Sequence, residues 1–398
     1  MKILFVQTTI TRYMHPLLEK IADFGHTLVM LIPEVAETGK AVKGAESTSC
    51  KYQVVKSPTK KMWYGKSGYP QLQSILAAQK PDILLIGWPY FMQLYFQKGI
   101  FKTLKNNNIR LILREIPFQV CPNGNISWYN DNPIIDENMA VKSHGLMFRL
   151  RMRLLMRVRK FLYSRADAAI CYCSEGKRIL PSYGIKPDNI FVTGNCTDTD
   201  SLYNVKQSVE AAEPLLPKRT RILHIGRLVK WKRVDLLINA FKKVLQQHPD
   251  VELAIVGSGP EEESLKNQAI TLGITDNVKF YGAVYDEFTL GRYMYESTIY
   301  VLAGMGGLSI NDAMTYGLPV IVSICDGTEK DLVEDGVNGF FFKNGDSVDL
   351  AEKINAVLSD PQRTKTMGEK SELIIRERFT ISKVAENFHN AFRSLAIP

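Results

Sequence analysis

The chain has few cysteines, no Cys-x-x-Cys pair and no apolar run long enough to cross a membrane. Its six cysteines in 398 residues lack the paired spacing of a zinc site, so we expect neither disulfides nor a bound metal ion. The apolar run near the N-terminus, residues 3–6, is too short for a secretory signal. Since no other segment reaches membrane-spanning length, we expect a cytoplasmic protein.

Positive charge is in excess. Lysine and arginine number 50 against 41 aspartate and glutamate residues, which gives a formal net charge of +9. This balance favours anionic partners such as phosphates, nucleic acid or an acidic membrane face, without choosing among them. The 45% hydrophobic content is that of an ordinary globular protein, and 398 residues exceed what one core normally holds. We therefore expect two domains.

Short apolar runs alternate with helical patterns in two series, which predicts two α/β units with parallel sheets. The runs begin at Lys2, Thr27, Asp82, Arg110 and Ala168 in the first series and at Arg221, Val251, Asn277, Thr298 and Leu318 in the second. The loop at residues 213–220, rich in Glu, Pro and Lys, is interpreted as the linker. It would join an N-terminal domain of residues 1–212 to a C-terminal domain of residues 218–381.

Glycines follow the strands of the second series, at 226, 257–259, 282 and 304–307. In an open parallel sheet these positions meet at the carboxyl edge, where ligands bind. Glycine lets a ligand approach the backbone, and the N–H groups that begin a helix favour negative charge. Each cluster alone is equally typical of a tight turn, but four in register predict a cradle for an anion that carries hydroxyl groups.

Two cations follow the first strand of this series. Arg227 comes just after the strand, and Lys232 comes five residues later, before an amphipathic helical pattern. Both could bind a diphosphate, Arg227 as a bidentate fork and Lys232 as a point charge. The alternative is that they are solvated surface cations, as we expect for Lys230 and Arg233.

Together these motifs resemble family 4 glycosyltransferases. The resemblance rests on GRLVKWKRVDLLINAF, AIVGSGPEEESL, NVKFYG, GGLSINDAMTYGLPVIVS and LVEDGVNGFFF in the second unit, and on DNIFVTGNCTDTDSLY at the end of the first. It implies a retaining enzyme of the GT-B fold, with two Rossmann-like domains whose parallel sheets face a central cleft. A C-terminal helix, about 382–398, would cross back onto the N-terminal domain.

The resemblance also implies a donor and a set of roles by position. The donor would be a nucleotide sugar, UDP- or GDP-linked, with no metal or other cofactor required. Arg227 and Lys232 would bind its diphosphate, and Asp312 would accept hydrogen bonds from the ribose hydroxyls. The other donor-binding positions are Gly226, Gly257, Gly306, Gly307 and Leu308. The chain departs from the family at Gly304, where a glutamate usually binds the donor sugar.

The first unit departs from the family as well. Arg114 and Glu115 stand at the strand end where the family often has a histidine. Glu115 is a candidate catalytic group and Arg114 a candidate acceptor or donor-sugar contact, although a local ion pair explains both. Thr8, Thr9 and Thr11 replace glycines that are usual after the first strand, and their hydroxyls are candidates for a phosphate or acceptor contact.

Retaining transfer uses either a carboxylate nucleophile or front-face attack through an oxocarbenium-like state. The sequence offers no convincing nucleophile, which favours the front-face route, with the departing phosphate helping to deprotonate the acceptor. Stabilisation of that phosphate by Arg227, Lys232 and backbone N–H groups would be the main contribution of the protein.

Residues 146–165 carry six arginines, one lysine and no acid. At helical spacing, apolar and basic residues fall on different sides. The apolar side is Met147, Leu150, Leu154, Val158, Phe161 and Leu162, and the basic side is Arg149, Arg153, Arg157 and Lys160. The pattern predicts either contact with an anionic membrane, which would suit a lipid-linked acceptor, or an ordinary helix with one buried face. It lacks the interleaved aromatics that nucleic-acid bases need, so we expect no nucleic-acid partner.

Other functions remain as alternatives to a transferase of bacterial polysaccharide or glycoconjugate assembly. A nicotinamide-dependent oxidoreductase is disfavoured because TTITRY, and no Gly-x-Gly-x-x-Gly turn, follows the first strand. A non-catalytic GT-B scaffold is the stronger alternative, since Gly304 removes a carboxylate of the family. A sugar-nucleotide epimerase of the same fold is a third.

Overall fold

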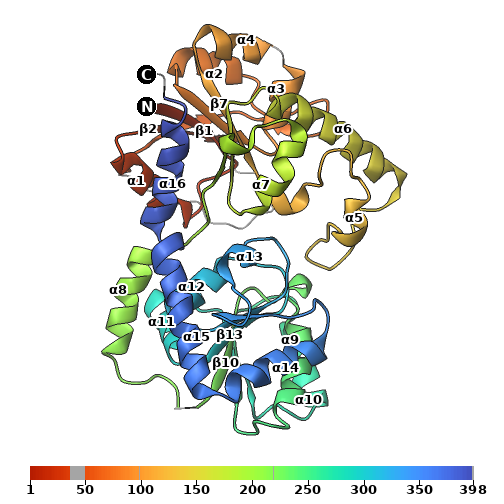
Figure 1. Cartoon of the computed structure of the whole chain (residues 1–398), viewed down its shortest axis with the longest axis vertical. Coiled ribbons are helices and arrows are strands. Elements are labelled where there is room, and N and C mark those ends of the chain that lie inside the picture. The colour runs from red at the N-terminus through yellow and green to blue at the C-terminus, as the bar shows by residue number, and fades with distance from the viewer. Residues whose placement is uncertain (36–49, 98, 218, 397–398) are drawn as a thin grey trace. The chain divides into compact units, whose positions relative to one another are not determined.

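The computed structural model describes residues 1–35, 50–97, 99–217 and 219–396 (Figure 1). Domain 1 comprises Met1–Asn132, Ser143–Asn195 and Ile381–Pro398, and domain 2 comprises Pro133–Lys142 and Cys196–Thr380. The boundary lies earlier than the predicted one at residues 212–218, because helix α8 (Thr199–Glu210) packs against α11 (Glu287–Tyr295) of domain 2. Residue 218, the predicted start of the second domain, lies outside the described residues.

Domain 1 contains a parallel sheet of seven strands in the order β3-β2-β1-β6-β7-β8-β9. The five predicted strands are present, and the sequence missed β3 and β9. The bounds are β1 (Lys2–Val6), β2 (Thr27–Pro33), β3 (Gln53–Ser57), β6 (Ile83–Gly87), β7 (Arg110–Glu115), β8 (Ala168–Cys171) and β9 (Ile190–Val192), with a separate hairpin of β4 (Lys60–Lys61) and β5 (Ser67–Gly68). In β1, an inner strand, Phe5 is in register with Met30 of β2 and Leu85 of β6. These side chains are buried, as expected for a sheet covered on both faces.

Helices of domain 1 include one from the far end of the chain. They are α1 (Met14–Asp23), α2 (Leu72–Gln79), α3 (Phe91–Phe96), α4 (Gly99–Asn106), α5 (Trp128–Asp131), α6 (Gly145–Tyr163), α7 (Glu175–Ile179) and α16 (Ile381–Arg393). Helix α16 packs against α1, and Figure 1 shows the blue helix beside the red one. The predicted return of the C-terminal helix to the first domain is therefore found, while residues 397–398 of that prediction lie outside the described range.

Domain 2 contains a parallel sheet of six strands in the order β12-β11-β10-β13-β14-β15. Their bounds are β10 (Arg221–Ile225), β11 (Glu252–Val256), β12 (Val278–Gly282), β13 (Ile299–Leu302), β14 (Val320–Val322) and β15 (Gly339–Phe341). Numbered within the domain, this is the order 3-2-1-4-5-6 of a Rossmann sheet, which places the switch of direction at β10. All five predicted strands are confirmed, and β15 was missed.

Helices cover both faces of the domain 2 sheet. Besides α8 and α11 they are α9 (Val234–Val244), α10 (Glu262–Thr271), α12 (Ser309–Thr315), α13 (Glu329–Leu332), α14 (Ser347–Leu358) and α15 (Pro361–Ile374). One core joins α9, α10 and α14 to the sheet, and a second joins α11, α12 and α15 to its other face. Both predicted α/β units are therefore confirmed.

Helix α6 buries its second half, where Val158 and Leu162 of the predicted apolar side face the core, and leaves its first half exposed. Its buried side chains are Leu155, Met156, Val158, Arg159, Leu162 and Tyr163. Of the predicted apolar side, Met147 is 72% exposed, and Leu150 and Leu154 are each 47% exposed. The first half of the helix thus shows apolar side chains to solvent. No helix in the described ranges is both long and apolar enough to cross a bilayer.

Candidate active site

The candidate site of domain 2 is built from turns at the carboxyl ends of four strands. Gly226 follows β10, Gly257 follows β11, residues 303–308 follow β13, and residues 323–328 follow β14. All these strands are parallel, and β10 lies at the switch point, so the turns meet at the edge where such sheets bind ligands.

Lys232 lies at the end of a short 3-10 turn (Lys230–Lys232) between β10 and α9. Its Nζ donates hydrogen bonds to the carbonyl oxygens of Met305 and Gly306, each at 2.8 Å. Burial lowers the pKa of this ammonium, and the nearby Asp326 carboxylate opposes the shift. Lys232 is thus a half-buried cation joined to the glycine turn and is not a solvated surface lysine.

Gly304 and Gly257 stand where the backbone of a neighbouring turn leaves no space for a side chain. A Cβ on Gly304 would lie 2.1 Å from the carbonyl oxygen of Trp231, and the Met305 N–H donates to that same oxygen. A Cβ on Gly257, whose φ is +146°, would lie 1.9 Å from the carbonyl oxygen of Gly226. The turn therefore has no room for a side chain at 304, and packing explains Gly257 without a ligand.

Arg227 meets a carboxylate that the sequence reasoning missed. Its Nη1 lies 3.1 Å and 3.3 Å from the two oxygens of Glu137, and the carbonyl of Glu137 accepts from the Trp231 N–H at 3.2 Å. Glu137 belongs to Pro133–Lys142, a short segment that packs with domain 2. An antiparallel bridge between Ile135 and Val141 closes this segment into a hairpin. Arg227, which the sequence analysis assigned to a diphosphate, is therefore paired with the carboxylate of Glu137 in this structure.

Asp312 lies on α12 and is half-buried. Its Oδ1 accepts a hydrogen bond of 2.5 Å from the hydroxyl of Thr197, in the segment that enters domain 2. Burial raises the pKa of Asp312 to about 7; Glu287 adds to the shift and the Thr197 hydroxyl opposes it. This carboxyl is therefore poised to change charge near neutral pH. Sequence reasoning found Asp312 but had no signal for Thr197.

The turn after β14 brings two further acids to this edge. Glu329 is 1% exposed and accepts from the N–H groups of Cys325 at 2.7 Å and Gly327 at 3.1 Å. Burial, with a contribution from Asp326, raises the pKa of Glu329 to about 7. Asp326 is half-buried beside Gly306. Neither acid was singled out from the sequence.

Domain 1 carries the remaining predicted residues at the carboxyl edge of its own sheet. Thr8 and Thr9 follow β1, and the buried hydroxyl of Thr11 has no hydrogen-bond partner among the described residues. Arg114, at the end of β7, lies over the ring of Phe5 at 5.7 Å and lines a small pocket with Asn195. Burial lowers the pKa of Arg114. These residues share an edge of domain 1, as expected.

Glu115 is placed differently from the prediction. It is 3% exposed, and its Oε2 lies 2.9 Å from Nε of Arg159 on α6 and 3.2 Å from the hydroxyl of Tyr163. The ion pair that the sequence offered as an alternative exists, but its partner is Arg159 and not Arg114. This geometry gives Glu115 a structural role and lends no support to a catalytic one. Likewise His224 is a buried structural histidine whose pKa is lowered by burial to about 4.

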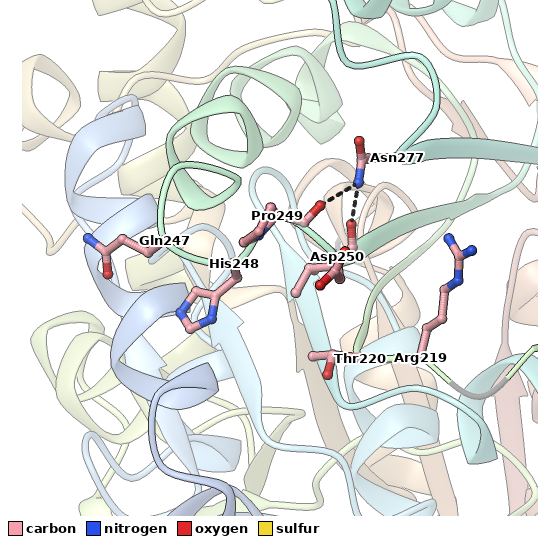
Figure 2. Close-up of a pocket in the computed structure, with 8 residues that line it drawn as sticks. Arg219, Thr220, Gln247, His248, Pro249, Asp250 and Asn277 are labelled. Carbon is pink, nitrogen blue, oxygen red and sulfur yellow. Dashed lines mark hydrogen bonds between the residues drawn. The ribbon is translucent and has the colours of Figure 1, made fainter.

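A larger pocket lies at the opposite edge of the domain 2 sheet. Figure 2 shows it, with Asn277 donating to the carbonyl oxygens of Pro249 and Val251 at 3.0 Å and 3.1 Å. Its volume is about 550 Å³, and Arg219, His248 and Asp250 also line it. These residues precede β10, β11 and β12, at the amino ends of the strands. In parallel α/β sheets ligands bind at the other edge, so the glycine turns, and not this pocket, form the candidate ligand site.

No group of three or more His, Cys, Asp and Glu residues within the described ranges could hold a metal ion. The six cysteines are free thiols. The side-chain cations described at this edge are Lys232 and Arg227.

Residues 205–373 match the family model described as Glycosyl transferases group 1. The match lies within domain 2 and includes the turns that carry Lys232, Gly304 and Asp312. Domain 2 is thus similar to group 1 glycosyl transferases over most of its length.

Curated relatives carry glycosyltransferase names. An uncharacterized glycosyltransferase of Haemophilus influenzae is 32% identical over 191 residues, which are 46% of this chain and 53% of the relative. A phosphatidyl-myo-inositol mannosyltransferase of Mycobacterium leprae is 30% identical over 208 residues, 51% of this chain and 53% of the relative. The chain spans about half the length of the curated relatives it matches.

Solved structures resemble the chain along its whole length. Anabaena Alr3699/HepE in complex with UDP matches with a TM-score of 0.66 at 19% identity, covering 99% of this chain and 100% of that chain. The lipopolysaccharide outer core galactosyltransferase WaaB, in its apo form, matches with a TM-score of 0.66 at 17% identity and full coverage of both chains. At such identities the likeness shows the fold alone, and it confirms the predicted GT-B class of two Rossmann-like domains.

Proposed function

We propose that the protein is a retaining glycosyltransferase that moves a sugar from a nucleoside-diphosphate sugar to a glycan or lipid-linked acceptor. The observation that carries the proposal is the carboxyl edge of the domain 2 sheet, where Lys232 binds the turn at 304–307 and Asp312 follows on α12. A cation beside bare backbone suits a diphosphate, and a carboxylate suits two ribose hydroxyls. The family match over residues 205–373 supports the same donor class.

In this proposal the protein acts mainly on the departing nucleoside diphosphate. Lys232 and the backbone of residues 306–308 bind it, and Arg227 joins them once a phosphate replaces Glu137. Fixed positive groups at a developing negative charge are usually the largest contribution to such catalysis. We propose a metal-independent front-face reaction, in which the leaving phosphate takes the acceptor's proton and the anomeric configuration is retained.

The acceptor is proposed to belong to bacterial polysaccharide or glycoconjugate assembly in the cytoplasm. Two matched proteins are named for lipid-containing molecules, lipopolysaccharide and phosphatidyl-myo-inositol. A lipid-linked acceptor would bring the enzyme to the inner face of a membrane.

Helix α6 supports that location. We call its exposed first part the α6 surface, with apolar residues Leu146, Met147, Leu150 and Leu154 and basic residues Arg149, Arg151, Arg153 and Arg157. Leu146, Leu150 and Leu154 recur every four residues and form one stripe, and the helix carries no acid. Exposed apolar side chains among basic ones are typical of helices that lie on anionic bilayers.

The second candidate function is a non-catalytic GT-B scaffold, and the third is an epimerase of the same fold. Gly304 supports the scaffold, because the turn excludes a side chain at the position where the family's glutamate would bind the sugar.

The first test is a thermal-shift panel of UDP, GDP, ADP, dTDP and NAD. A ligand at 100 times its dissociation constant stabilises a protein by about 2.7 kcal/mol, so one preferred nucleoside diphosphate should stand out. An activity assay then separates the candidates. Product that forms only when an acceptor is present would support the transferase, and conversion of the donor without an acceptor would support the epimerase. Stabilisation by NAD alone would overturn the proposal.

A further inference from the structure

Two opposite charges pack where side chains at Gly306 and Gly307 would stand. A Cβ on Gly306 would lie 2.8 Å from Oδ2 of Asp326, and a Cβ on Gly307 would lie 3.4 Å from Nζ of Lys232. Because the two glycines are adjacent, a carboxylate and an ammonium line the same short stretch of backbone. Gly307 is exposed and Gly306 is half-buried, so this stretch reaches solvent.

Asp326 is positioned by its own turn. Its Oδ1 accepts from the Thr328 N–H at 2.9 Å, and its backbone N–H donates to Glu329 Oε2 at 3.3 Å. Glu329 also binds the N–H groups of Cys325 and Gly327, so the buried carboxyl organises the whole turn. Side chains held by such a supporting shell keep a fixed direction, which is what a binding residue needs.

We propose that Asp326 binds a hydroxyl of the donor sugar. A nucleotide sugar presents an anionic phosphate directly beside a ring of hydroxyl groups. A cation and a carboxylate over adjacent glycines match that pair, since an ammonium donates to phosphate oxygen and a carboxylate accepts from hydroxyls. Gly304 has no room for a side chain, so the carboxylate of the sugar subsite comes from the end of the next strand, β14. This inference rests on the proposed function and adds the residue that selects the sugar.

The test compares binding of nucleoside diphosphates with binding of their sugar derivatives. Calorimetry would use UDP with UDP-glucose and UDP-N-acetylglucosamine, and GDP with GDP-mannose, on the wild type and on Asp326→Ala and Asp326→Asn. The control is Asp276→Asn, which removes the same charge from an exposed position before β12. Thermal unfolding without ligand shows whether each variant folds.

Asp326→Ala should weaken the preferred nucleotide sugar about ten- to a hundredfold, as expected for a hydrogen bond to a charged group, and change the parent diphosphate less than threefold. The affinity of Asp326→Asn, which keeps one acceptor oxygen, for the nucleotide sugar should lie between those of the wild type and Asp326→Ala. Equal losses for diphosphate and sugar derivative would overturn the inference, because Asp326 would then act through Lys232. Unchanged affinities would overturn it too. A wild type that binds none of the nucleotides would instead refute the proposed function.

Discussion

At the scale of a single residue, Asp312 should make nucleotide binding depend on pH. Burial raises its pKa to about 7, above the usual value of a carboxyl group. Only the ionised form can accept hydrogen bonds from both ribose hydroxyls without giving one oxygen to a proton. With a pKa near 7, the ionised fraction is about one in eleven at pH 6 and about ten in eleven at pH 8. Affinity for the nucleotide sugar should therefore rise about tenfold across that range.

The measurement is the dissociation constant of the preferred nucleotide sugar from pH 6 to 8. A nucleotide sugar is the better probe, because a terminal phosphate has its own second pKa near 6. Asp312→Asn should bind more weakly and without this pH dependence. Thr197→Val should move the midpoint to higher pH, since the Thr197 hydroxyl lowers the pKa of Asp312. A flat wild-type profile would contradict the assignment of Asp312 to the ribose.

Glu137 should compete with the donor for Arg227. The two side chains are paired at 3.1 Å but remain 48% and 62% exposed, respectively. Exposed pairs contribute about 0.2–1 kcal/mol, so Glu137→Gln should tighten diphosphate binding by about two- to fivefold. The readout is titration of the wild type and variant with the same nucleoside diphosphate at low salt.

A double-mutant cycle separates this effect from a change in the hairpin. Arg227→Ala should weaken binding, and adding Glu137→Gln to it should then change nothing, because the competed cation is gone. Asn138→Ala, at the neighbouring hairpin position, is the control. Equal gains in the presence and absence of Arg227 would show that Glu137 acts by another route.

Among single residues, the sequence revealed those whose position along the chain carries a signal. Lys232 and Asp312 stand at fixed distances from strand ends, and both reach the predicted edge. Glu137 and Thr197 carry no such signal, because each matters only through a partner that folding brings to it. Asp326 follows β14, but its place beside Gly306 shows only in the fold. The partner of Glu115 could not be predicted for the same reason, since Arg159 lies 44 residues away along the chain.

At the scale of elements, the α6 surface should bind anionic bilayers. Each basic residue near an anionic surface contributes about 1 kcal/mol, so losing two should weaken vesicle binding about thirtyfold. We expect this loss for the double variant Arg149→Gln and Arg153→Gln in co-sedimentation with phosphatidylglycerol-containing vesicles. Leu146→Ser with Leu150→Ser should also reduce binding, including at high salt, where charge attraction is screened.

The control for charge is Lys242→Gln with Lys243→Gln on α9, an exposed pair in domain 2. This variant has the same net charge as the arginine variant but keeps the α6 surface. If both variants lost vesicle binding equally, attraction would depend on overall charge and not on α6. Binding to neutral phosphatidylcholine vesicles that equals binding to anionic ones would contradict the electrostatic contribution.

Strands were predictable where several consecutive residues are buried in the sheet. β1, β7, β10 and β11 each have at least three consecutive buried residues. β3, β9 and β15 are edge strands with one buried residue each, so none shows the buried-strand pattern. Periodicity predicted the α6 helix, but which apolar residues face the core depends on what packs beside it. Leu155 and Met156 meet the core, whereas Leu150 and Leu154 do not.

At the scale of the whole molecule, a buried arginine–glutamate pair is found in the described part of each domain. In domain 1 Arg159 binds Glu115 at 2.9 Å, and in domain 2 Arg221 binds Glu252 at 2.6 Å. Both pairs are nearly inaccessible to solvent. Removing one partner of a buried pair leaves an uncompensated charge and costs about 3–5 kcal/mol. The pairs therefore allow each domain to be destabilised separately.

Glu115→Gln should lower protection from hydrogen exchange in domain 1, and Glu252→Gln should lower it in domain 2. The preferred nucleoside diphosphate, at 100 times its dissociation constant, should restore about 2.7 kcal/mol to domain 2 in the second variant, because its site lies there. The nucleoside diphosphate should not restore protection from hydrogen exchange to domain 1 of the Glu115→Gln variant. The same comparison decides the role of Glu115. If Glu115→Gln kept wild-type exchange throughout domain 1 and yet lost sugar transfer, the buried pair would not be structural, and the catalytic role that the sequence suggested for this carboxylate would have to be restored.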